Sequence, residues 1–179
     1  MIKALLLILY NWIRIALGKL FHPGRFRVHW MQRISPKCSL KLFGKGKLEI
    51  GRNCDISPYC DLEVHGNGVL KIGDGCYFNR FCMISAQENV TIGERCMFGP
   101  GVKVFDNNHK HSPEEGVSPE LTTSPITIGD RCWICSDAVI LKGVRIGNNC
   151  VVGAGCVVRE DLPDGTVVTL TQEMEVWNR

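Results

Sequence analysis

Acidic residues are missing from the first 48 positions of this 179-residue chain. That stretch carries ten lysines and arginines, whereas residues 49–179 carry eleven basic and eighteen acidic residues. A basic and apolar segment of this kind is suited to the anionic surface of a membrane leaflet. Low-complexity segments are missing too. The sequence therefore predicts one folded domain with an N-terminal appendage, and we expect no nucleic-acid partner.

A hydrophobic run long enough to span a membrane is also absent. Residues 4–9 are all apolar, but Arg14 and Lys19 interrupt the apolar residues beyond them, so the run is too short and too charged for a span. No small-x-small cleavage site comes after it, which argues against a secretory signal. We expect an apolar, basic helix over residues 1–24. This helix either lies on a membrane through residues 1–21 or caps the open end of the fold, and the two roles are compatible.

Cysteine pairs with the spacing of a zinc site are scarce. Of ten cysteines, only Cys132 and Cys135 form a Cys-x-x-Cys pair, and no second pair or nearby histidine accompanies them. Nine cysteines instead share one slot, four residues after an apolar residue, where a small hydrophobic side chain fits. They are Cys38, Cys54, Cys60, Cys76, Cys82, Cys96, Cys132, Cys150 and Cys156. We therefore expect reduced packing residues, no metal, and a reducing compartment such as the cytoplasm.

A six-residue period dominates the residues that are present. The phrase Ile-Gly-x-x-Cys starts at Ile50, Ile72, Ile92, Ile128 and Ile146, and apolar residues continue from these in steps of six. This period is typical of a β-helix solenoid, in which three six-residue units make one triangular coil. The head of each unit points inward, and stacked coils bury a common apolar column. The glycine after each isoleucine suits a corner where a Cβ would forbid the backbone dihedral angles.

One interval departs from this spacing. Ile128 and Ile146 are 18 residues apart, which is one coil, whereas Ile92 and Ile128 are 36 residues apart. The excess predicts a loop at residues 105–124 that protrudes from an otherwise tight stack. Long loops on rigid solenoids usually carry function.

Three stretches of the repeat and the start of the loop resemble a known family. They are residues 128–134 (IGDRCWI), 138–147 (AVILKGVRIG), 152–158 (VGAGCVV) and 106–109 (DNNH). Over residues 50–165 the chain resembles the hexapeptide-repeat acyltransferases, in particular the maltose, galactoside and surface-polysaccharide O-acetyltransferases. The resemblance implies an all-β fold, a left-handed parallel β-helix of about five to six triangular coils over residues 25–168. An N-terminal helix, the one protruding loop and a C-terminal tail at residues 169–179 complete it. The resemblance also implies a homotrimer with acetyl-CoA bound between neighbouring subunits.

The resemblance assigns catalysis to a histidine of the loop. His109 matches the family's catalytic histidine and would act as general base on a sugar hydroxyl, without a covalent intermediate because a thioester is already electrophilic. His111 is the alternative base. Asn79 aligns with an asparagine that touches the acceptor in similar enzymes, although asparagine is also common in turns. Asp106 is expected either to contact the acceptor or only to cap the loop.

Coenzyme binding is assigned mainly to the last coils. The expected cofactor-binding residues are Trp133, Ser136, Lys142, Gly153, Ala154, Gly155 and Arg159. The Gly-Ala-Gly phrase either lets the pantetheine arm lie close to the backbone or simply forms a tight corner. Two departures from the family are visible. Cys135 replaces a small residue, and the usual Gly-Asn-Pro-Ala-Lys tail is absent from residues 169–175.

These features predict an acyl-CoA-dependent O-acetyltransferase that acts on a hydroxyl of a sugar or lipid-linked glycan precursor. We expect it in the cytoplasm, with peripheral contact to the inner face of the membrane. A non-catalytic β-helix scaffold is the first alternative. A zinc carbonic anhydrase is the second, and it is disfavoured because only His65, His109 and His111 lie in the coils of residues 50–165, with a spacing that does not suit that enzyme.

Overall fold

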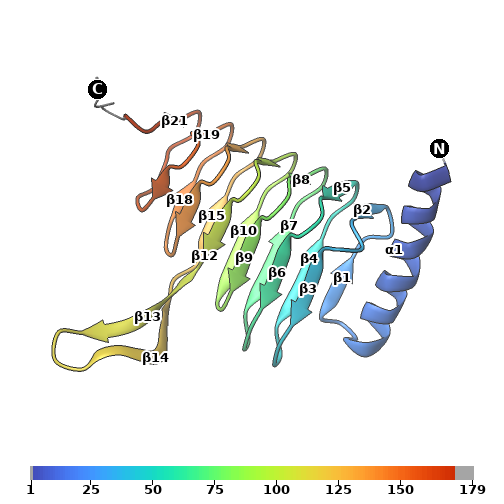
Figure 1. Ribbon diagram of the computed structural model, residues 1–179, viewed down its shortest axis with the longest axis horizontal. Coiled ribbons are helices and arrows are strands. Elements are labelled where there is room, and N and C mark those ends of the chain that lie inside the picture. The colour runs from blue at the N-terminus through green and yellow to red at the C-terminus, as the bar shows by residue number, and fades with distance from the viewer. Residues whose placement is uncertain (1, 172–179) are drawn as a thin grey trace, which may run out of the picture.

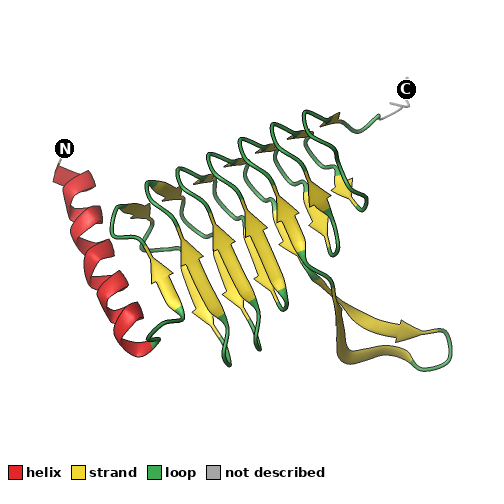
Figure 2. Cartoon of the chain, turned by 180° about the vertical axis from the view of Figure 1, so that it is seen from behind, coloured by secondary structure: helices red, strands yellow, loops and turns green. Residues whose placement is uncertain are grey.

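The computed structural model of the chain describes residues 2–171, with side chains from residue 5 onward, so most of the predicted tail lies outside the described residues. Three parallel sheets wind into a solenoid, and one hairpin projects from it (Figure 1 and Figure 2). The one helix among these residues, α1 (Ile2–Phe21), lies at the N-terminal end of the solenoid (Figure 1).

Each complete coil contributes one strand to each of three sheets, which we call A, B and C, and β21 adds a further strand to sheet B alone. Sheet A contains β1 (Phe26–Val28), β4 (Lys47–Ile50), β7 (Val69–Ile72), β10 (Asn89–Ile92), β15 (Ile126–Ile128) and β18 (Arg145–Ile146). Sheet B contains β2 (Gln32–Ile34), β5 (Cys54–Ile56), β8 (Tyr77–Phe78), β11 (Met97–Phe98), β16 (Trp133–Ile134), β19 (Val151–Val152) and β21 (Val167–Val168). Sheet C contains β3 (Ser39–Leu42), β6 (Asp61–Val64), β9 (Met83–Ala86), β12 (Lys103–Phe105), β17 (Val139–Leu141) and β20 (Val157–Val158). The predicted all-β solenoid is confirmed, and its coils agree with a left-handed parallel β-helix.

Residues one coil apart face each other across parallel ladders. Ile50 of β4 pairs with Ile72 of β7, and both are buried in one continuous core. Within that core the rings of Phe78 and Phe98 stack with their centroids 4.4 Å apart. Each coil thus covers the apolar interior of its neighbour, as the six-residue period predicted.

The glycines of the Ile-Gly phrases are required for a different reason from the one predicted. Positive φ angles occur two residues later, as at Asn53, and not at these glycines. A Cβ at Gly73 would lie 2.6 Å from the carbonyl oxygen of Gly93, and one at Gly147 would lie 2.5 Å from the amide nitrogen of Asp164. The expectation of a forbidden dihedral was wrong here, because the close approach of the next coil is what excludes a side chain.

The shared cysteine slot is buried, as predicted. Nine of the ten cysteines are buried, Cys135 is partly exposed, and all are free thiols. The Sγ of Cys60 lies 2.9 Å from the carbonyl oxygen of Asn79, so this thiol can also donate weakly to a corner of the next coil. Burial raises the pKa of the Cys38 thiol to about 12, which keeps that thiol protonated and unreactive.

Helix α1 caps the first coil. Ile15 is buried against the core, and Asn11 Nδ2 donates to the carbonyl oxygen of Ile34 at 3.0 Å. Arg14 Nη2 donates to the carbonyl oxygen of Cys38 at 2.7 Å. The capping role is therefore observed. Among the described residues, no helix has both the length and the apolar character that crossing a bilayer requires.

The extra residues between β12 and β15 form the predicted protrusion. β13 (Asn107–Ser112) and β14 (Gly116–Thr123) pair as an antiparallel hairpin that projects away from the solenoid (Figure 2). Because β12 belongs to sheet C and β15 to sheet A, the hairpin leaves the edge between these two sheets. We call this edge the C–A edge.

Candidate functional site

Asp106 ties the root of the hairpin to the solenoid. Its side chain is fully buried, and its carboxylate accepts backbone N–H bonds from Gln87 at 2.8 Å, Glu88 at 2.8 Å and Asn89 at 2.9 Å. Asn107 Nδ2 adds a fourth donor at 3.1 Å. These donors satisfy both oxygens of the buried carboxylate. Of the two roles expected for Asp106, the geometry supports the loop cap and leaves no acceptor position for a sugar.

His109 lies on β13 with an exposed side chain, and its Nδ1 is 3.1 Å from the carbonyl oxygen of Ser118 on β14. A carbonyl oxygen only accepts, so Nδ1 carries the proton in this bond. Nε2 of the neutral ring then keeps its lone pair, which is the tautomer that a general base requires. The second strand of the hairpin thus orients the imidazole on the first.

His111, the alternative base, is also exposed on β13. It pairs across the hairpin with Val117, whereas His109 pairs with Leu121, and a register irregularity lies between the two histidines. Within residues 5–171, no hydrogen bond to the ring of His111 selects one tautomer. The hairpin therefore prepares His109 rather than His111 to accept a proton.

Five predicted site residues lie on another edge of the solenoid, between sheets B and C, which we call the B–C edge. They are Asn79, Ser136, Gly153, Ala154 and Gly155. The Oδ1 of Asn79 accepts the N–H of Arg80 at 2.8 Å, as expected of an asparagine in a turn. A Cβ at Gly153 would lie 2.9 Å from the carbonyl oxygen of Val168, so this glycine forms a tight corner. Ala154 beside it is exposed.

The other cofactor-binding candidates are more widely spread. Trp133 faces outward from β16 and is 53% exposed. Lys142 comes directly after β17 and so lies on the C–A edge, from which the hairpin projects. Arg159 is exposed on the last complete coil and lines a pocket of 320 Å³ together with the final described segment.

One chain does not bring these candidates together. His109 and Lys142 belong to the C–A edge, Asn79 and Gly153 belong to the B–C edge, and the width of sheet C separates the two edges. The hairpin also projects away from its own coils (Figure 1). Over the part of the chain that the structure describes, no group of three or more His, Cys, Asp or Glu side chains is placed to hold a metal ion.

Two contacts at the site were missed by sequence reasoning. Ser118 provides the carbonyl oxygen that orients His109, and residues 87–89 provide the N–H groups that hold Asp106. Both contacts use backbone atoms, so no residue type marks them in the sequence.

Parts of the sequence are similar to known proteins. Residues 125–160 match the family model described as "Bacterial transferase hexapeptide (six repeats)". Galactoside O-acetyltransferase of Escherichia coli (strain K12) is 41% identical over 78 residues, which cover 44% of this chain and 38% of that protein. The putative lipopolysaccharide biosynthesis O-acetyl transferase WbbJ of the same strain is 37% identical over 94 residues, or 48% of each protein. The chain thus spans less than half the length of these curated relatives.

Solved structures share the fold. A mutant of AntD, an N-acyltransferase from Bacillus cereus in complex with dTDP-4-amino-4,6-dideoxyglucose and coenzyme A, superposes with a TM-score of 0.68 at 19% identity. The match covers 93% of this chain and 90% of AntD. The polysialic acid O-acetyltransferase OatWY superposes with a TM-score of 0.54 at 19% identity and covers 82% of this chain and 90% of its own. The resemblance to hexapeptide-repeat acyltransferases that the sequence indicated is confirmed.

Proposed function

We propose that this chain, which carries the hexapeptide repeat of bacterial transferases, moves an acetyl group from acetyl-CoA to a hydroxyl of a sugar or glycan precursor. Relatives named as O-acetyltransferases and a fold neighbour solved with a nucleotide-linked amino sugar and coenzyme A support this substrate class. The observation in this chain that carries the proposal is His109, which a carbonyl holds with Nε2 free on a hairpin outside the coils.

In this proposal His109 is the general base. The acceptor hydroxyl oxygen attacks the thioester carbonyl, and its proton passes to His109 Nε2. The carbon–oxygen bond forms, the carbon–sulfur bond breaks, and the imidazolium returns the proton to the sulfur of coenzyme A. Direct attack needs no protein nucleophile, so no covalent intermediate forms. The carbonyl of Ser118 accepts from Nδ1–H throughout, which fixes the ring and stabilises the imidazolium.

The site would close between copies of the chain in a homotrimer. Each copy offers one C–A edge with His109 and one B–C edge with Asn79, and these edges do not meet within one chain. Such unlike edges make a heterologous contact, which closes into a ring when the rotation between copies is right. Packing three solenoids side by side would place the hairpin of one copy against the B–C edge of the next. The acceptor would lie there between His109 and Asn79.

Coenzyme A would lie along the last coils of this groove. Trp133 offers an exposed aromatic face, Ser136 a hydroxyl and Ala154 a small exposed side chain. Lys142 and Arg159 are the cations that would meet its phosphates. The tight corner at Gly153 is closed by Val168 and Thr169, so the pantetheine arm would pass over Ala154.

A lipid-linked glycan precursor at the cytoplasmic face of a membrane is the acceptor class that we favour. The ten free cysteines suit a reducing compartment. The basic and apolar N-terminal segment suits a substrate that is built at the bilayer.

Release of the coenzyme A thiol from acetyl-CoA, measured over a panel of sugars and nucleotide-sugars, tests the proposal. His109→Ala should lower turnover at least about 100-fold, as expected when a general base is lost. His111→Ala is the matched control on the same strand and should stay within about two-fold of the wild type. Sedimentation should give one trimer for all three proteins. Undiminished turnover of His109→Ala would refute the base, and a wild type that acetylates no sugar would favour the scaffold alternative.

A further inference from the structure

Helix α1 has the reverse of the polarity that a helix on a soluble surface shows. Its polar side chains turn inward: Asn11 is fully buried, and Arg14 donates to the carbonyl oxygens of Ser35 and Cys38. Every exposed position between residues 5 and 21 carries an aliphatic or aromatic side chain, and none is charged. Six of these form a stripe at helical spacing, which we call the cap face: Leu6, Leu9, Ile13, Leu17, Leu20 and Phe21, each between 44% and 72% exposed.

The cap face points away from the coils. α1 is the outermost element at the N-terminal end of the solenoid (Figure 1). Copies packed against the sides of the solenoid would therefore leave it uncovered. Contiguous apolar surface of this kind marks an interaction site.

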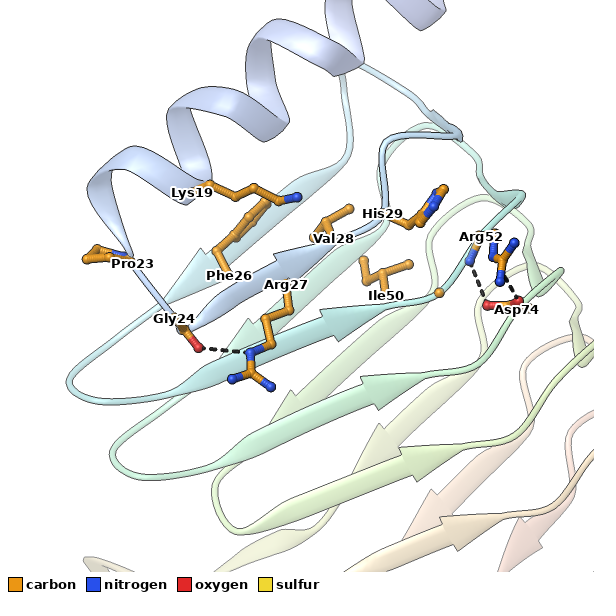
Figure 3. Close-up of a pocket in the computed structure, with 11 residues that line it drawn as sticks. Lys19, Pro23, Gly24, Phe26, Arg27, Val28, His29, Ile50, Arg52 and Asp74 are labelled. Atoms are coloured by element: carbon orange, nitrogen blue, oxygen red, sulfur yellow. Dashed lines mark hydrogen bonds and ion pairs between the residues drawn. The ribbon is translucent and has the colours of Figure 1, made fainter.

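Positive charge accompanies this apolar stripe. No aspartate or glutamate occurs before Glu49. At the C-terminal end of α1 a pocket of 640 Å³ opens, lined by Lys19, Arg27 and Arg52 against one carboxylate, that of Asp74 (Figure 3). Asp74 pairs with Arg52 at 3.7 Å and Glu49 pairs with Arg27 at 3.5 Å, which leaves Lys19 to set the charge of the side nearer the helix.

We propose that the cap face docks on an anionic lipid bilayer, with α1 in the plane of the interface and Lys19 beside the lipid phosphates. A helix with apolar residues on one side and basic neighbours sinks about 5–10 Å into the boundary between headgroups and acyl chains. Trp12, 45% exposed beside the stripe, is suited to that boundary. A second copy fits less well, because two basic segments without a single acidic residue would then face each other.

Vesicle flotation of the full chain tests this docking. Wild-type protein should bind phosphatidylcholine vesicles that contain about 30% phosphatidylglycerol, and bind pure phosphatidylcholine at least about ten-fold more weakly. The double variant Ile13→Glu/Leu17→Glu should bind the anionic vesicles at least about 100-fold more weakly, since each buried aliphatic side chain contributes about ten-fold or more. Val167→Glu is the matched control: Val167 is 66% exposed at the opposite end of the solenoid, and its variant should bind like the wild type.

Two further readouts make the outcome decisive. Lipids brominated in their acyl chains should quench the fluorescence of Trp12 in the wild type, and this quenching should be lost in Trp12→Phe. Because this readout does not use the double variant, it tests the docking even if the double variant folds poorly. A wild type that ignores anionic vesicles, or a double variant that binds them equally, overturns the proposal. A wild-type assembly that the double variant dissociates, without vesicle binding, would assign the cap face to a second copy instead. None of these results depends on acetyl transfer, so the proposed function stands or fails separately.

Discussion

The carboxylate of Asp106 is the most exacting test of how the hairpin is held. Asp106→Ala removes the acceptor for three backbone N–H groups, those of residues 87–89, and for Asn107 Nδ2. A buried donor without a partner costs about 1–3 kcal/mol, and bonds to a charged acceptor are at the upper end. This corner lies at an edge of the solenoid, so water can reach some of the freed donors. We therefore expect the free energy of unfolding to fall by about 2–4 kcal/mol, less than the full sum.

Amide hydrogen exchange locates this effect. If the loss is local, the amides of Gln87, Glu88 and Asn89 should exchange about 30- to 1,000-fold faster in Asp106→Ala, which is the same free energy expressed as a ratio of opening constants. Asp130→Ala is the matched control. The Oδ1 of Asp130 accepts the N–H of Glu94 at 2.8 Å at the edge between sheets A and B, far along the coil from the hairpin root. That variant should accelerate hydrogen exchange at the amide of Glu94 and leave the exchange rates of residues 87–89 unchanged.

A size-matched variant separates charge from packing. Asp106→Asn keeps the shape but turns one acceptor oxygen into an NH₂ donor that would face the same N–H groups, so it should restore only part of the protection. Amides of residues 87–89 that exchange as slowly in Asp106→Ala as in the wild type would show that the carboxylate does not hold the hairpin.

Three other predictions concern the coils. Gly73→Ala should lower the free energy of unfolding in urea by about 2–4 kcal/mol, because its Cβ would meet the backbone of the next coil; an unchanged midpoint would contradict the stacking argument. A thiol reagent should react promptly only with Cys135 in the native protein and with all ten cysteines in denaturant without reductant; fewer would reveal disulfides. Lys41 lowers the pKa of Glu63 through a 2.6 Å hydrogen bond. The pair therefore stabilises the fold fully at pH values above 4.5, the carboxyl's ordinary pKa. This stabilisation is lost as the pH falls through the lower pKa that Glu63 has in the folded protein. Glu63→Gln should flatten the acid side of the stability curve, and a slope as steep as that of the wild type would refute the coupling.

The solenoid was predictable because its stability is nearly one-dimensional. Ile50 needs only Ile72 above it, and that pair repeats every coil, so the period in the sequence is the period in space. The protruding hairpin was predictable for the same reason, as an interval that the period could not absorb. The capping role of α1 was predictable only as one of two alternatives. In the sequence, Asn11 and Arg14 look like the polar stripe of an ordinary helix, and only the structure shows that they donate hydrogen bonds inward to the first coil.

The details of the site were less predictable because they depend on contacts to backbone atoms and on which edge of the solenoid each residue occupies. Asp106 carries the residue type of a sugar ligand, yet it is used to bind three amides of the preceding coil. The partner of His109 is a carbonyl, which any residue at position 118 would provide. Asn79 and His109 can be assigned to different edges of the solenoid only when the bounds of the strands are known, because each edge is defined by the two sheets that flank it.

If the proposed membrane docking and the proposed role of His109 both hold, the cap and the hairpin together restrict the acceptor. The hairpin leaves the fourth coil, three coils beyond the one that α1 covers. Neighbouring strands are about 4.8 Å apart, so the root of the hairpin lies roughly 15 Å from the first coil, and the helix that covers this coil adds about 10 Å. If the cap face rests on a bilayer, His109 works a few sugar lengths above the headgroups, on a hairpin that projects sideways from the solenoid. A soluble sugar gains nothing from that placement. A glycan whose lipid stays in the bilayer would be confined to the height at which His109 is held, so the two proposals together favour a lipid-linked acceptor over a free one.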